Sequence, residues 1–157
     1  MRRTTGKSHC PINFGLEAFG DPWALLVVRD IVYFGKHTFK EFLASEEAVA
    51  PSVLAARLAR LDADGILDRT PDPTDARRVV YNLTEAGLGL IPILLEIANW
   101  SASIDPETDA PPEWIAAVRR DETTMTDLIV RTVRNGGSIF VGADSVVASL
   151  TQPATTQ

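Results

Sequence analysis

Two adjacent arginines, Arg77 and Arg78, follow a turn-rich segment at residues 71–75. A guanidinium group at the tip of a hairpin can clamp phosphates or enter the minor groove of a duplex. Asp72 and Asp75, in the same loop, offer local neutralisation of that charge as the alternative. We expect Arg77 and Arg78 to contact DNA.

A predicted helix that begins near Pro51 and ends at Asp64-Gly65 precedes this loop. An apolar stripe at positions i, i+4 and i+7 assigns one face to the core: Leu54, Leu58 and Leu61. The opposite face is short, with Ser52, Ala55, Ala56 and Ala59, and Arg57 and Arg60 lie on its flanks.

This helix has the candidate groups for contact with bases. Ser52 can donate to a base or a phosphate, and Ala56 can touch a thymine methyl group. We expect Arg57 to contact DNA, whereas Arg60 either contacts DNA or stays on the solvated surface. The alternative for both arginines is an ion pair with a nearby carboxylate: Asp62, Asp64 or Glu41.

Further candidates for phosphate contact surround the start of the preceding helix. Thr38 and Glu41 form the capping-box pattern, so a helix is predicted from that point. Lys36, Thr38 and Lys40 lie around its first turn, where a helix attracts anions.

Cys10 is the single cysteine, and it stands before Pro11 at the start of a short predicted helix. A thiol near a helix N-terminus and cations such as Lys7 and His9 has enhanced thiolate character. Two interpretations are open, a redox-sensing thiol and an inert semi-buried cysteine. A disulfide would have to be intermolecular, because there is only one cysteine.

The sequence offers no pattern for catalysis, a metal or a cofactor. His9 and His37 are the only histidines, and with one cysteine no spacing resembles a zinc site. No phosphate-cradling or dinucleotide-binding glycine motif is present. We therefore expect no enzyme activity, no metal and no cofactor.

The elements that position these residues follow one another in an informative order. Helix, turn and helix cover residues 38–65, and strands are predicted at Ile66–Thr70 and Arg78–Leu83. This is the layout of a winged helix-turn-helix. The predicted fold is therefore mainly α with a small β-hairpin (α+β), flanked by helices that dimerise.

Those flanking helices are strongly apolar. One is predicted to start at Asp21-Pro22 and to end at Gly35. Another, rich in leucine and isoleucine, covers residues 88–100, where Pro92 either kinks the helix or marks its start. We expect a homodimer built from the helix at 88–100 and the segment before Pro22.

Two domains are expected, residues 1–103 with the winged helix and the dimerisation helices, and residues 104–157 as an acidic extension. The extension should be mostly helical, broken near Asp121, with a short strand at 138–141 and a frayed tail over the last dozen residues. It would add to the dimer or shape an effector pocket.

Charge is uneven along the chain. The net charge is −6, of which residues 1–103 carry −2 (11 basic, 13 acidic) and residues 104–157 carry −4 (4 basic, 8 acidic). A local basic face on the first part is therefore possible. The sequence has no apolar run of membrane-spanning length and no secretory signal at the N-terminus. We therefore expect a cytoplasmic protein that does not associate with a membrane.

Several residues together resemble the HxlR-type transcriptional regulators, which are related to the MarR regulators. The resemblance covers about Cys10 to Trp100 and rests on the order and spacing of short motifs: Cys10-Pro11, Gly20, Trp23, residues 25–29, Phe39, Leu43, residues 54–61, residues 64–67 and residues 81–87.

This resemblance implies a homodimeric DNA-binding repressor or activator. The two-fold symmetry of a dimer then predicts a pseudo-palindromic operator. The resemblance also implies that Cys10 is a candidate sensor of oxidants or electrophiles. The chain departs from the family pattern at Ala50 and on its alanine-rich reading face. Two alternatives are therefore open: a regulator of the same fold that answers a small hydrophobic ligand, and a winged helix that contacts only proteins.

Overall fold

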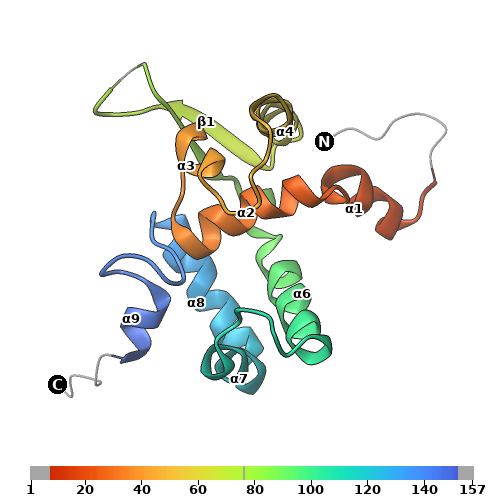
Figure 1. The fold of residues 1–157 in the computed structure, drawn as a ribbon, viewed down its shortest axis with the longest axis vertical. Coiled ribbons are helices and arrows are strands. Elements are labelled where there is room, and N and C mark those ends of the chain that lie inside the picture. The colour runs from red at the N-terminus through yellow and green to blue at the C-terminus, as the bar shows by residue number, and fades with distance from the viewer. Residues whose placement is uncertain (1–7, 76, 152–157) are drawn as a thin grey trace. The chain divides into compact units, whose positions relative to one another are not determined.

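The structure is a computed structural model that describes residues 8–75 and 77–151. Its contacts divide the chain into two compact units, Met1–Ile31 with Lys36–Gly87, and Val32–Gly35 with Leu88–Gln157. Figure 1 labels most of the elements of both units. The fold is mainly helical with one antiparallel hairpin, as predicted.

The first unit contains α1 (Pro11–Phe19), most of α2 (Pro22–Phe34), α3 (Phe39–Leu43) and α4 (Pro51–Ala63). It continues with β1 (Leu67–Pro71), β2 (Val79–Leu83) and the start of α5 (Glu85–Leu88). This element order confirms the predicted winged helix-turn-helix, and both strands lie within one residue of their expected bounds.

Local sequence signals set the helix boundaries of this unit. The carboxylate of Asp21 accepts hydrogen bonds from the amides of Trp23 and Ala24, so α2 begins where predicted. The predicted capping box of Thr38 and Glu41 is complete at the start of α3.

The predicted apolar stripe of α4 forms the core of the first unit. Leu54, Leu58 and Leu61 are each at most 1% exposed, and Phe42 of α3 is buried as well. Gly65, at φ 71°, ends α4 in the left-handed region that favours glycine. The chain then turns into the hairpin, in which Leu67 pairs with Leu83 and Pro71 with Val79.

The second unit contains the end of α2 and α6 (Ile91–Ile104), α7 (Pro112–Arg120), α8 (Glu122–Arg134) and α9 (Val146–Thr151). Pro92 lies in the first turn of α6, so it marks the start of the helix and does not kink it. The predicted break near Asp121 is confirmed, because the Asp121 carboxylate caps α8 through the amide of Thr124.

Two expectations for the C-terminal part were wrong. Residues 138–141 do not form a strand, because the amides of Ile139 and Phe140 cap the end of α2 by donating to the carbonyls of Val32 and Tyr33. The tail is not frayed over Val146–Thr151, which forms α9 with Val146 buried and the hydroxyl of Ser145 bonded to the amide of Ala148.

Two other sequence expectations, the absence of an N-terminal signal and the fraying of residues 152–157, fall on parts of the chain outside the described residues.

Glu85–Ile104 has the length and apolar composition of a membrane-spanning helix, with a mean hydropathy of 1.4. A core helix of a soluble protein can have the same composition. In the second unit α6 packs against α7 and α8, and its side chains Ile91, Leu94 and Leu95 are buried. Packing therefore accounts for one face of α6, and a second apolar face remains exposed.

Ala48, in the turn between α3 and α4, has a φ of 50°. This left-handed conformation costs an L-residue about 1–2 kcal/mol, whereas glycine adopts it freely but loses more entropy on folding. Ala48→Gly should therefore raise the free energy of unfolding by roughly 0.5–1 kcal/mol. Urea denaturation measures this.

The matched control is Ala59→Gly, an exposed change inside α4 that should lower stability by about 1 kcal/mol. A loss of stability in Ala48→Gly equal to that of the control would contradict the strained turn.

Candidate nucleic-acid interface

The outward face of α4 is exposed, as the sequence predicts. Ser52 and Ala56 are both exposed on it, and Val53 is 39% exposed. These side chains are too short to reach deeply into a groove, so the face favours close approach of the helix over long hydrogen-bonding contacts.

Arg57 lies against the N-terminus of α2. Its Nη1 is 2.9 Å from Oδ2 of Asp21, and both side chains are 27% exposed. Its Nε is buried and has no hydrogen-bond partner in the described part of the chain. Asp21 was not among the partners considered from the sequence, because the two residues are distant along the chain and meet only in the fold.

Arg60 forms the surface ion pair that the sequence offered as one alternative. Its Nε lies 2.5 Å from Oδ2 of Asp64, one helical turn further on, and the arginine is 57% exposed. Asp64 is only 12% exposed, but the guanidinium group of Arg60 faces solvent and could exchange this partner for a phosphate.

The wing carries two highly exposed cations of the predicted site. Arg77 and Arg78 are 91% and 68% exposed, and their Nε atoms lie 3.1 Å and 3.6 Å from the carboxylate of Asp75. The hydrogen bond from Arg77 is the main reason that the pKa of Asp75 lies below its ordinary value. Local neutralisation thus occurs in the isolated chain, and a phosphate would compete with Asp75 for both arginines.

Lys36 and Thr38 have roles inside the protein. The Nζ of Lys36 donates to Oγ of Ser45 at 2.7 Å and lies 3.3 Å from Oδ2 of Asp30. The hydroxyl of Thr38 completes the cap of α3. Lys40 is exposed at the start of α3.

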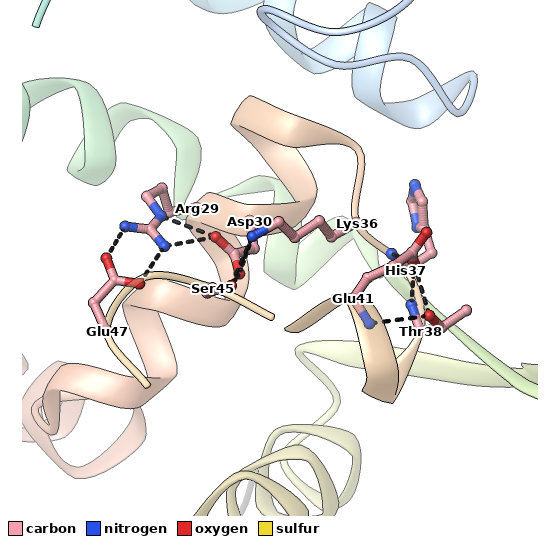
Figure 2. A network of polar contacts seen from close by, with 8 residues as sticks. All are labelled: Arg29, Asp30, Lys36, His37, Thr38, Glu41, Ser45 and Glu47. Carbon is pink, nitrogen blue, oxygen red and sulfur yellow. Dashed lines mark hydrogen bonds and ion pairs between the residues drawn. The ribbon is translucent and has the colours of Figure 1, made fainter. Parts of the chain in front are cut away.

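A buried charge network, which sequence reasoning missed, surrounds Asp30 (Figure 2). Asp30 is only 2% exposed, and its carboxylate accepts from Arg29, Lys36 and Ser45. Arg29 also pairs with Glu47 in the turn between α3 and α4. The signal available in the sequence was a charged pair, Arg29-Asp30, inside an otherwise apolar helix.

The same network shifts the protonation of its members. Burial alone would lower the pKa of Arg29, but its hydrogen bonds to Glu47 and Asp30 outweigh burial and hold the pKa above its ordinary value. The hydrogen bond from Arg29 lowers the pKa of Glu47. These pairs connect α2 to the turn that leads into α4.

A second polar group gathers around Glu41 on the other side of Lys36 (Figure 2). The Oε2 of Glu41 accepts from the amides of His37 and Thr38 at 2.9 Å and 2.8 Å, and from the Thr38 hydroxyl. The Nδ1 of His37 lies 2.9 Å from the carbonyl oxygen of Tyr81 in β2. The start of α3 is thereby joined to the wing.

Cys10 is exposed and stands at the N-cap position of α1. Its amide donates to Oγ of Ser8 at 3.1 Å. The structure describes no group of three side chains able to hold a metal ion between residues 8 and 151, Ala76 aside.

An α3–turn–α4 unit with an exposed second helix, followed by a hairpin, defines the winged helix-turn-helix class of transcriptional regulators. The family model of HxlR-like helix-turn-helix proteins matches residues 18–109, more than half of the chain. The chain belongs to this family. The family implies DNA binding and transcriptional regulation rather than catalysis.

Related sequences are themselves described as HTH-type transcriptional regulators. Mb3122 of Mycobacterium bovis is 34% identical over 97 residues, which are 62% of this chain and 60% of the relative. YybR of Bacillus subtilis is 33% identical over 97 residues, or 62% of this chain and 77% of the relative. The match thus spans about three fifths of the mycobacterial relative.

Solved structures agree with this assignment. PA1607, a candidate transcription factor, superposes with a TM-score of 0.60 at 32% identity, covering 67% of this chain and 73% of its own. The redox regulator HypR in its oxidised form gives a TM-score of 0.53 at 30% identity, covering 60% of this chain and 96% of its own. Residues 110–157 lie outside the family match.

The cap of α3 should make stability depend on pH. Burial raises the pKa of Glu41, but the hydrogen bonds from His37 and Thr38 outweigh it and hold the pKa below the ordinary value of 4.5. The ionised carboxylate therefore contributes stability above that value, and the contribution is lost as the pH falls through the folded-state pKa. The stability gap between wild type and Glu41→Gln should shrink on acidification.

Urea denaturation at about pH 7 and about pH 3 measures the gap. Glu46→Gln, an exposed change in the adjacent turn, is the control. A gap for Glu41→Gln that is constant with pH would rule out the capping carboxylate as its origin.

Proposed function

We propose that this regulator binds a pseudo-palindromic operator as a homodimer, mainly through phosphate contacts and DNA shape. The observation that carries the proposal is the juxtaposition, in one compact unit, of the exposed face of α4 with a wing that ends in Arg77 and Arg78. Short side chains on α4 let the helix approach the groove closely, while the wing arginines supply charge.

Lys40, Arg60, Arg77 and Arg78 are the exposed cations proposed to contact the backbone, and Ser52 and Ala56 lie where a base edge would be. Lys36, Thr38 and Arg57 act chiefly by supporting this surface, because Lys36 and Thr38 form hydrogen bonds within the protein and Nη1 of Arg57 pairs with Asp21. We place the protein in the cytoplasm, as expected for a DNA-binding regulator.

Exposed apolar side chains support the homodimer. Ile97, Trp100 and Ile104 of α6 are 44%, 66% and 66% exposed, and Ile12 and Leu16 of α1 are 70% and 59% exposed. Side chains of this size are stable on a surface when a second copy covers them. Two-fold symmetry then predicts half-sites about one helical turn apart.

The expected boundary between two domains, after residue 103, stays a prediction.

Fluorescence anisotropy with the DNA upstream of the protein's own gene tests the proposal. We expect specific binding that weakens steeply with salt, and weaker binding to a single half-site. Arg77→Ala/Arg78→Ala should make the slope of log K against log salt less steep by up to about 2, which corresponds to two lost phosphate contacts.

The matched control is Arg119→Ala/Arg120→Ala, an adjacent exposed arginine pair at the end of α7. Equal slopes for the wing variant and wild type would remove the wing from the interface. No specific binding to any upstream fragment would favour the alternative of a winged helix that contacts only proteins.

As a second proposal, we infer that the redox state of the Cys10 thiol controls this DNA binding. The thiol is exposed at the start of α1, and two structural neighbours are a redox regulator, HypR, and the regulator YodB in its reduced form. An exposed thiol at this position on each subunit could form an intersubunit disulfide or a mixed disulfide with a small thiol.

Treatment with diamide should change operator affinity in wild type and leave Cys10→Ser unaffected. Anisotropy before and after reduction measures the change. An identical response of both proteins would exclude Cys10 as the switch, and a ligand-induced melting shift without any thiol effect would favour a small hydrophobic effector.

A further inference from the structure

The wing hairpin contacts α4 through β1, but little of that strand is buried. It consists of two strands, and in β1 only Leu67 is buried while Asp68–Pro71 are exposed. An isolated two-stranded hairpin is marginal in water. The residues that contact the other edge of β2 therefore help to set the direction of the wing.

His37 holds that edge at one residue, Tyr81. The amide of Tyr81 donates to the carbonyl oxygen of His37 at 2.8 Å, and the carbonyl oxygen of Tyr81 lies 2.9 Å from Nδ1 of His37. Because a carbonyl oxygen only accepts, Nδ1 is the donor in this hydrogen bond. Next to this contact, Thr38 forms an isolated bridge with Val80.

The imidazole supplies a donor that the backbone does not. The amides of His37 and Thr38 both donate to Glu41 in the cap of α3 (Figure 2). The imidazole ring is left to contact the carbonyl oxygen of Tyr81. Glu41 thus holds residues 37 and 38, and His37 in turn holds β2. The ring of Tyr81 also packs edge-on against Phe42 of α3, with 6.1 Å between the ring centroids.

This anchor lies close to the wing arginines. Arg78 is three residues before Tyr81, or about 10 Å along an extended strand. A change of strand direction at Tyr81 therefore displaces Arg78, and Arg77 with it. The same residues 37 and 38 directly precede α3, and Thr38 caps it, so one anchor fixes the wing relative to the helix-turn-helix.

We propose that His37, held by Glu41, is a positioning residue that aims Arg77 and Arg78 at DNA phosphates. This inference rests on the proposed wing contact. It assigns to His37 no contact with DNA itself. Its effect on affinity must therefore pass through the two arginines.

A double-mutant cycle tests this dependence by anisotropy over a salt series. His37→Ala should weaken operator binding several-fold and flatten the salt slope, since each lost phosphate contact costs about fivefold in affinity near 0.15 M salt. In the Arg77→Ala/Arg78→Ala background the same change should have no further effect on affinity or slope.

His37→Asn, whose amide can donate to the Tyr81 carbonyl, should restore most of the affinity, and His9→Ala is the control for loss of a histidine. Thermal melting checks that each variant is folded. His37→Leu, which keeps apolar bulk without a donor, takes the place of His37→Ala in the cycle if that variant does not fold.

The outcomes distinguish the positioning role of His37 from the wing contact with DNA. Equal losses of affinity from His37→Ala with and without the wing arginines would overturn the positioning role and leave the wing contact intact. An Arg77→Ala/Arg78→Ala variant that binds like wild type would overturn the wing contact, and the positioning role with it.

Discussion

The buried carboxylate of Asp30 is the constraint on which the DNA-binding unit depends. A charge that is 2% exposed is tolerated only when it is fully paired, and its partners come from three places: Arg29 beside it, Lys36 after α2 and Ser45 after α3. Arg29 extends the pairing to Glu47. The turn that contains the strained Ala48 is thereby fixed to α2, and with it the start of α4.

Lys36 and His37, which are adjacent in the sequence, stabilise two different elements. Lys36 reaches back to Asp30 and Ser45, which set the turn before α4, while His37 reaches Tyr81, which sets the wing. The two elements that are proposed to contact DNA are thus both stabilised by one short segment. This suits a surface with little base-reading chemistry, since contact with phosphates and groove shape depends on where the elements lie more than on long side chains.

Local patterns predicted most of the fold, because caps and periodicity act within a few residues. The Asp21 cap, the Thr38–Glu41 capping box and the leucine stripe of α4 were all found this way. Pairing between residues distant in the sequence produces no local pattern. Arg57 contacts Asp21, and His37 contacts Tyr81, only in the folded chain. Residues 138–141 were mistaken for a strand for the same reason, since their partners are the last carbonyls of α2.

Hydroxyl-radical footprinting of the full chain on its upstream DNA tests the central claim most directly. A homodimer that reads shape and phosphates predicts two related protected patches about one helical turn apart, with protection at their flanks that disappears in Arg77→Ala/Arg78→Ala. Uniform cleavage along the fragment at protein concentrations that saturate binding, or a single patch without a symmetric partner, would contradict it.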